Sequence, residues 1–195
     1  MKLTLASTSK FKNEIFDKVK LTHYSMKPTC EEISSKTNPY EYVMELSLNK
    51  AKSILEKSKT DIIIGLDPIV VINDKIIEKP KSTEEAKQNL RDSSNNKASI
   101  ITGIAIINKE TNQVINTYQE SIVYFNEISE SDINFYIENE PDYLYASGFI
   151  VETIASNFIN KIEGSYYNIL GAPVEKIYDI LKTEFKLDLY SINNK

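Results

Sequence analysis

Hydrophobic and polar residues alternate along the chain in two rhythms, one typical of strands and one typical of helices. Strand-like segments are short apolar runs, or runs in which every second residue is apolar. The Asn73-Asp74 pair between two of them has the composition of a tight hairpin turn. The expected strands cover residues 3–6, 21–27, 62–66, 69–72, 75–77, 98–108 and 113–126.

Helix-like segments have apolar residues three or four positions apart, so that these residues share one face. After the first helix, the pattern predicts helices over about residues 39–58, 82–91 and 173–186. Another helix opens at Ser129 or Ser131 and runs to about Asn139, and residues 144–162 mix short strands with loop. This mixed order of strands and helices predicts an α/β fold, with helices covering a twisted sheet.

The N-terminal stretch LTLASTSKFK, residues 3–12, combines a strand, a hydroxyl-rich turn and a helix start. Ser and Thr suit such a turn because their oxygens accept hydrogen bonds from the first N–H groups of a helix. Those N–H groups and the helix dipole also favour an anion, and Lys10 and Lys12 add positive charge. Taken alone, the stretch is more simply an ordinary capped helix. Its apolar face is expected to hold Phe11, Ile15, Phe16 and Val19.

Composition places the chain among globular proteins of one domain, residues 1–195, or two small lobes. Its net charge of -5 excludes broad nucleic-acid binding, but a local lysine cluster can still hold a small phosphorylated ligand. Cys30 is the only cysteine, so no internal disulfide is possible. No apolar run approaches the ~20 residues of a membrane helix, and no signal peptide is expected. These observations predict a cytoplasmic protein that binds neither nucleic acid nor membrane.

Acidic residues at four positions are candidates for metal binding or acid–base chemistry. Asp67 ends an apolar strand, where a carboxylate is costly unless it is paired or bound to metal. Glu31 and Glu32 lie in a polar loop, and Glu152 has apolar neighbours. Such carboxylates can hold Mg²⁺ together with phosphate oxygens, or activate a water molecule. Each of them alone is more simply a solvated or capping acid.

Lys12, Lys50 and Lys79 form the matching positive set. Each alone would be an ordinary surface lysine. Together with the hydroxyl turn at residues 7–9, they could surround a triphosphate. The sequence therefore permits a phosphate site near its N-terminus.

Several other chemistries are excluded. His23 is the only histidine, so a multi-histidine metal site is excluded. His23 itself is more simply a strand or loop residue. Cys30 is more simply an incidental thiol than a nucleophile. The chain has neither a GxxxxGK[ST] nor a GxGxxG motif, and only five glycines, which excludes a glycine-rich phosphate loop.

Several segments follow one another along the chain: LASTS, EYVMELSLNKAK, IIIGLDPIVV with EKP, ITG at 101–103, and EGSYYNILGAPV. This ordered set resembles the Maf family of nucleoside triphosphate pyrophosphatases. The resemblance covers essentially the whole chain. It implies an elongated α/β fold related to inosine triphosphate pyrophosphatases, with two lobes around a central cleft, and a homodimer. It also implies cleavage of a nucleoside triphosphate between the α and β phosphates with a divalent metal, Mg²⁺ or Mn²⁺.

The same resemblance implies roles for individual residues. Asp67 matches the family's catalytic aspartate, as metal ligand or water-activating base, and Glu32 and Glu31 would join it at the metal. Lys12 and Glu152 would complete the catalytic set. The substrate-binding residues implied by the resemblance are Ser7, Ser9, Phe11, Lys50 and Lys79.

Two branches of the family differ in substrate, and this chain has features of both. Phe11 and Glu152 resemble the 7-methyl-GTP branch, and a cationic methylated guanine would favour an aromatic face and a carboxylate. Residues 165–167, Ser-Tyr-Tyr, resemble the dTTP/UTP branch instead. The sequence favours 7-methyl-GTP or a related modified nucleotide, with dTTP or UTP as the alternative.

The chain also departs from the family pattern. Lysines replace a proline at position 10 and an arginine at position 12, and Lys12 lacks the bidentate fork of arginine. The other departures are Pro68, Ala98, and Ser147, Thr153 and Ala155 in place of glycines. They leave open a weakly active nucleotide-binding protein in growth or division control. A third alternative is a scaffold whose acidic surface binds a protein partner.

Overall fold

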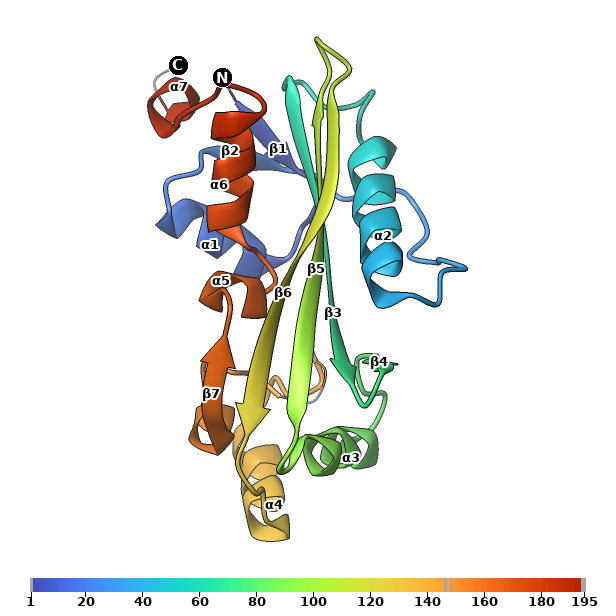
Figure 1. Cartoon of the computed structure of the whole chain (residues 1–195), viewed down its shortest axis with the longest axis vertical. Helices are drawn as coiled ribbons and strands as arrows, with labels where there is room; N and C mark the ends of the chain where they lie inside the picture. Colours follow the sequence, from blue (N-terminus) through green and yellow to red (C-terminus); the bar gives the residue numbers. More distant parts are fainter. Residues whose placement is uncertain (1, 146, 148, 194–195) are drawn as a thin grey trace. The chain divides into compact units, whose positions relative to one another are not determined.

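The computed structural model describes residues 2–145, 147 and 149–193 (Figure 1). The chain divides into two compact units, and each is described by itself. The first unit contains the residues up to Pro68, Ile101–Gln119, and the residues from Tyr167 onwards. The second contains Ile69–Ile100 and Glu120–Tyr166. Three long strands contribute residues to both units.

The described strands form one seven-stranded mixed sheet with the order β2-β1-β3-β5-β6-β7, and β4 pairs with β3. β1 runs parallel to β2 and to β3, with Leu3 opposite His23 and Ile62. β4 is antiparallel to β3, and β7 is antiparallel to β6. The strands are β1 Leu3–Leu5, β2 His23–Ser25, β3 Ile62–Ile72, β4 Lys75–Ile77, β5 Lys97–Asn108, β6 Val114–Phe125 and β7 Ile159–Glu163.

In the first unit, helices cover both faces of the sheet (Figure 1). Ile62 and Ile64 of β3 pack toward α1 (Lys10–Lys18), α6 (Val174–Thr183) and α7 (Leu189–Asn193). Ile63, between them, packs on the opposite face with Ala51 of α2 (Pro39–Ser53). Successive side chains of a strand point to opposite faces, so a strand buried on both sides is apolar throughout.

The backbone of α2 lies directly against two strands, and two glycines make this approach possible. A Cβ atom on Gly65 of β3 would lie 2.1 Å from the carbonyl oxygen of Ser47. A Cβ atom on Gly103 of β5 would lie 2.0 Å from that of Val43. No other residue fits at such distances, since van der Waals contact requires more than 3 Å. The close approach places Lys50, one turn after Ser47, over β3.

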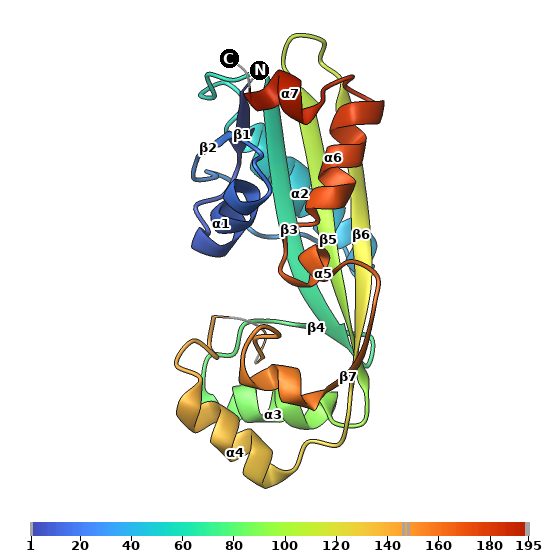
Figure 2. The same cartoon turned by 90° about the vertical axis from the view of Figure 1, so that its left-hand side faces the viewer.

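The second unit has its own core between α3 (Thr83–Ser93), α4 (Glu130–Asn139) and the 3₁₀ helix Ile154–Phe158 (Figure 2). The Phe125 and Phe149 rings pack edge to face at 5.1 Å, and the Tyr136 and Phe158 rings at 6.4 Å. The hydroxyl of Tyr136 accepts a hydrogen bond from the backbone N–H of Ile150 at 2.8 Å, which satisfies its buried oxygen.

The α/β fold predicted from the sequence is confirmed, and most elements lie where the pattern placed them. Asn73 and Asp74 form the hairpin turn, both with φ near 60° as a tight turn requires. Ser82 caps α3, and Ser129 rather than Ser131 caps α4 in a capping box. The short helices α5 (Tyr166–Ile169) and α7 were not predicted. A single helical turn has no periodicity to detect.

Three local predictions were wrong. β3 does not end at Asp67 but continues to Ile72, because its last residues pair with β4. α1 buries Lys12 and leaves Phe11 52% exposed, so its buried side is rotated from the expected one. The side chain of Ser9 stands at the N-cap of α1 but makes no capping hydrogen bond.

Candidate active site

A buried lysine–aspartate pair lies between α2 and β3. The Lys50 ammonium donates a hydrogen bond to Asp67 Oδ1, and the two residues are 8% and 6% exposed. The same ammonium forms an ion pair with Glu32 Oε1 at 2.9 Å. Glu32 lies in the loop before α2 and is exposed. Lys50 therefore links one buried carboxylate to one that faces solvent.

The pKa values of the pair follow from this arrangement. Burial raises the pKa of the Asp67 carboxyl above its ordinary value, although Lys50 and Lys12 act in the opposite direction. Burial alone would lower the pKa of Lys50, but its attraction to Asp67 and Glu32 outweighs burial and raises it. Burial dominates at Asp67 while attraction dominates at Lys50, because Lys50 contacts two carboxylates.

Lys12 brings a second buried cation to the same place. It lies in the first turn of α1, is 9% exposed, and its Nζ is 3.4 Å from the carbonyl oxygen of Leu66, the residue before Asp67. Its positive charge opposes the rise in the pKa of Asp67. Two lysines and two acids thus form one cluster in the first unit: Lys12, Lys50, Glu32 and Asp67.

Gly171 also borders this cluster, and the sequence analysis missed it. It has φ +77°, and a Cβ atom there would lie 3.1 Å from Pro68 Cγ and 3.7 Å from Lys12 Cε. The left-handed backbone favours glycine. The chain has five glycines, and one of them lies in the short connection between α5 and α6. This was the one sequence signal that could have pointed to Gly171 as a site residue.

Two hydrogen bonds hold the hydroxyl turn before α1, one within the turn and one from Ser25. Ser7 Oγ accepts from the backbone N–H of Ser9 at 3.1 Å, and the Ser25 hydroxyl donates to the Ser7 carbonyl. Ser7 is buried and Ser9 is partly exposed. The turn leads directly into the helix that carries Lys12 and the exposed Phe11.

The remaining candidates lie elsewhere. Glu31 is exposed and takes part in no ion pair or hydrogen bond among the described residues, unlike Glu32. Lys79 and Glu152 are both exposed and belong to the second unit. Glu152 stands in the turn before the 3₁₀ helix, so its apolar sequence neighbours do not bury it.

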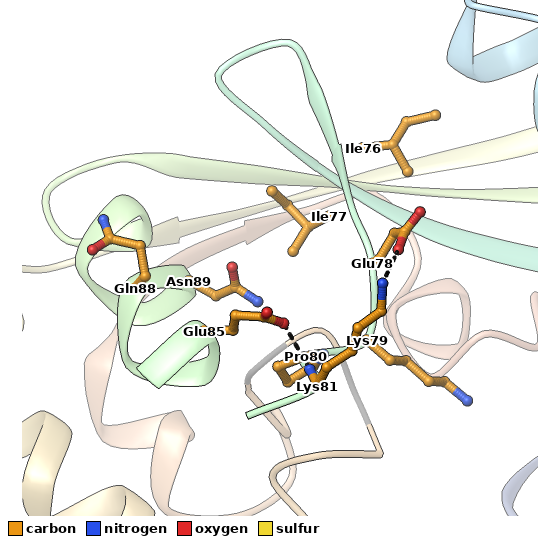
Figure 3. A pocket seen from close by; sticks show the side chains of 9 residues that line it. All are labelled: Ile76, Ile77, Glu78, Lys79, Pro80, Lys81, Glu85, Gln88 and Asn89. Carbon is orange, nitrogen blue, oxygen red and sulfur yellow. Dashed lines mark hydrogen bonds and ion pairs between the residues drawn. The ribbon is translucent and has the colours of Figure 1, made fainter. Parts of the chain in front are cut away.

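Lys79 lines a pocket of about 310 Å³ between β4, the segment after it, and α3 (Figure 3). Its walls combine the apolar Ile76 and Ile77 with charged side chains. The backbone N–H of Lys81 donates to Glu85 Oε2 at 2.7 Å, which ties the segment after β4 to the start of α3. This pocket lies entirely within the second unit.

Thr153 and Ala155, which stand where the resembled family has glycines, fit the second unit without backbone strain. Thr153 has φ -119°, and Ala155 is buried in the 3₁₀ helix. Neither lies in the left-handed region that would favour glycine. Ser147 donates to the Ile77 carbonyl at 3.3 Å. The residues beside it, 146 and 148, lie outside the described residues.

Glu32 and Asp67 offer a donor set for a divalent cation. No group of three or more His, Cys, Asp or Glu side chains among the described residues could hold a metal ion by itself. The two carboxylates nevertheless surround one positive charge, the Lys50 ammonium. Mg²⁺ is commonly held by one or two carboxylates together with substrate phosphates and water. The residues present therefore fit such an ion with a phosphorylated ligand. No helix in the part of the chain that the structure describes is long and apolar enough to cross a membrane.

Comparison with known protein sequences gives matches over nearly the whole chain. The family model described as Maf-like protein matches residues 2–184. The dTTP/UTP pyrophosphatase of Thermoanaerobacter sp. (strain X514) is 35% identical over 190 residues, covering 97% of this chain and 100% of the relative. The 7-methyl-GTP pyrophosphatase of Aliivibrio fischeri (strain ATCC 700601 / ES114) is 34% identical, covering 94% and 96%. The nucleoside-triphosphatase / dITP/XTP pyrophosphatase structure from Mycobacterium abscessus has a TM-score of 0.41 at 14% identity, covering 64% of this chain and 74% of that one.

Proposed function

Because this chain belongs to the family of Maf-like proteins, we propose that it hydrolyses a nucleoside triphosphate to the monophosphate and pyrophosphate. The observation that carries the proposal is the buried Lys50–Asp67 pair, with Lys12 and Glu32 beside it. Full-length relatives named as nucleotide pyrophosphatases support the same reaction.

In this proposal, the lysines bind the phosphates. A triphosphate carries several negative charges, and the cleavage develops further charge on the leaving pyrophosphate. Lys12 and Lys50 are held in place before substrate arrives, so their charges stabilise the transition state without reorganisation. The Ser7–Ser9 turn, at the start of the helix that carries Lys12, contributes hydroxyl groups to the same phosphates.

Asp67 is proposed as the base. The oxygen of a water molecule attacks the α-phosphorus, the bond from that phosphorus to the bridging oxygen breaks, and pyrophosphate leaves. The Asp67 carboxylate accepts the proton that the water loses. A carboxyl group whose pKa burial raises is a better proton acceptor than a solvated one, and Lys50 keeps it oriented.

We also propose that Glu32 and Asp67 hold a divalent cation, Mg²⁺ or Mn²⁺, together with the substrate. When bound, the ion supplies charge neutralisation at the phosphate oxygens. Lys50 contacts both carboxylates and would keep them oriented toward such an ion.

For the substrate we expect dTTP and UTP first, because most of the matched relatives carry that name. 7-methyl-GTP is the second candidate, supported by the exposed Phe11 and by one full-length relative. Purified protein should release pyrophosphate and nucleoside monophosphate in equal amounts from at least one of these in a panel of triphosphates with Mg²⁺ or Mn²⁺. Nucleotide binding without turnover would support the weakly active alternative, and no binding at all would contradict the proposal.

Phe11→Ala separates the two substrates. The Phe11 side chain is 52% exposed, so its removal should change the free energy of unfolding by less than about 1 kcal/mol. Loss of an aromatic face should raise KM about 5-fold for 7-methyl-GTP, whose base is cationic, and less for dTTP or UTP. Phe135→Ala, an equally exposed phenylalanine on α4, is the control. Equal KM changes for all substrates would remove Phe11 from base selection.

A further inference from the structure

His23, at the start of β2, is connected to the hydroxyl turn before α1 through one side chain. Its imidazole is 4% exposed and packs edge to face against Phe16, with ring centroids 5.0 Å apart. Its Nε2 atom is 2.8 Å from Asn13 Oδ1. The amide nitrogen of Asn13 in turn donates to the carbonyl oxygen of Ser9 at 2.7 Å. A chain of hydrogen bonds therefore runs from His23 through Asn13 to Ser9.

The Ser9 carbonyl determines which way the Asn13 amide points. A carbonyl oxygen only accepts hydrogen bonds, so the NH₂ group of Asn13 must face it. The Oδ1 atom of Asn13 then faces His23 and can only accept. His23 Nε2 must therefore carry a proton if the chain of hydrogen bonds from His23 to Ser9 is to be complete.

The other ring nitrogen also faces an oxygen. His23 Nδ1 is 2.9 Å from the carbonyl oxygen of Leu21. Both nitrogens donate only when the ring is an imidazolium, because neutral imidazole has one donor and one acceptor. A neutral ring would leave one of these contacts unbonded, or would turn the Asn13 amide and bring its oxygen against the Ser9 carbonyl.

The charge around the ring is compatible with a proton on both nitrogens. The Asp17 carboxylate of α1 is 3.9 Å from Nδ1 and is exposed. The other neighbours, Asn13, Phe16 and the Leu21 carbonyl, are uncharged. Asp17 thus places a carboxylate near the Nδ1 side of the ring.

We propose that His23 is a positioning residue for the phosphate site, which it supports through Asn13 when its ring is protonated. The inference rests on the proposed function, because it assigns the Ser7–Ser9 turn to phosphate binding. The protonated ring holds Asn13 against the Ser9 carbonyl and so restrains the turn that precedes Lys12.

Binding of inorganic tripolyphosphate, measured by calorimetry on the full chain, tests this. Asn13→Leu keeps the branched shape and the charge but removes both hydrogen bonds, and should weaken binding about 5-fold at pH 6. The control is Thr22→Val, also neutral and close in volume, which removes the Thr22–Asn193 hydrogen bond beside His23 but none to Ser9. Both variants are measured in the same buffer, so the titration of tripolyphosphate itself does not affect the ratio of their dissociation constants.

Nitrogen-15 NMR supplies a readout that is independent of activity. The chain has one histidine, so its ring resonances need no assignment. At pH 6 the wild-type protein should show two slowly exchanging ring N–H protons, and Asn13→Leu should show only the one at Nδ1. His23→Phe keeps the packing against Phe16 but removes both ring nitrogens, and it should weaken tripolyphosphate binding as Asn13→Leu does.

The outcomes separate the inference from the proposed function. Turnover of a nucleoside triphosphate with equal tripolyphosphate binding by Asn13→Leu and Thr22→Val would overturn the role of His23 alone. One ring N–H instead of two at pH 6 would do the same. Failure of the wild-type protein to bind tripolyphosphate would overturn the phosphate role of the turn and this inference with it, whereas the substrate panel decides the reaction.

Discussion

Asp67→Asn should lower kcat by about 1,000-fold or more, while the far-UV circular dichroism spectrum stays unchanged. Asparagine has nearly the volume of aspartate, so the packing of β3 is preserved, but an amide cannot accept the proton of the attacking water. Loss of a general base typically costs 100- to 10,000-fold. The loss of a proposed metal ligand adds to this effect. The measurement is pyrophosphate release at saturating substrate.

The pH dependence of stability gives the same variant a second readout. Burial raises the pKa of Asp67 in the folded protein, so the folded state binds this proton more tightly than the unfolded state does. Ionisation of Asp67 therefore costs stability as pH rises from the ordinary carboxyl range, near pH 4, through the folded pKa. Asp67→Asn removes that cost, and its stability relative to wild type should rise as pH increases from about 4 through the folded pKa of Asp67.

Asp74→Asn is the matched control. Asp74 lies in the exposed turn that follows β3, and asparagine suits its positive φ. This substitution removes the same charge from the same hairpin without touching Lys50. Activity that is lost equally in both variants, or retained in Asp67→Asn, would contradict the assignment of Asp67 as base.

Lys50→Met should remove both activity and a substantial part of the stability. Methionine fills the space of the lysine stem but leaves the buried Asp67 without the ammonium that it contacts. Removing one partner of a buried ion pair costs about 3 kcal/mol or more at neutral pH. Chemical denaturation at pH 7 measures this, and Lys52→Met, on an exposed face of α2, is the control.

Acid should reduce the stability deficit of Lys50→Met. Without the attraction of Lys50, the pKa of Asp67 rises further in the folded protein. The deficit is then smallest where the carboxyl is protonated, below about pH 4, and grows as pH rises toward 7. The double variant Lys50→Met with Asp67→Asn should recover part of the loss at pH 7, because no buried charge remains. A deficit that does not change with pH would show that packing, rather than charge, accounts for it.

Much of the fold could be predicted from the sequence. The apolar run at residues 62–66 predicted a strand buried on both faces, because such a strand needs no polar side. The Asn73-Asp74 turn was recognisable because these residues satisfy local backbone requirements. The continuation of β3 beyond Asp67 was missed, since strand pairing with β4 depends on residues that a local pattern does not include.

The candidate site was predicted in part. The sequence contained the right chemical types, lysines and acids in family order, and the resemblance placed Glu32 at the metal with Glu31 beside it, but the helical pattern put Phe11 on the apolar face. Glu32 pairs with Lys50 and Glu31 does not, because neighbouring side chains in a loop point in different directions. Gly171 was missed, since its closeness to Lys12 arises from residues more than 150 positions apart.

By itself, the sequence determined the order of the longer strands and helices, the family and the residue types available for phosphate chemistry, because periodicity and turn residues act locally. Only the tertiary structure decided which of those residues meet. The approach of α2 to β3 at Gly65 places the Lys50 ammonium on Asp67 in a buried position, where burial and charge set both pKa values. The link from His23 to Ser9 through Asn13 is likewise tertiary, because it depends on β2 lying against α1.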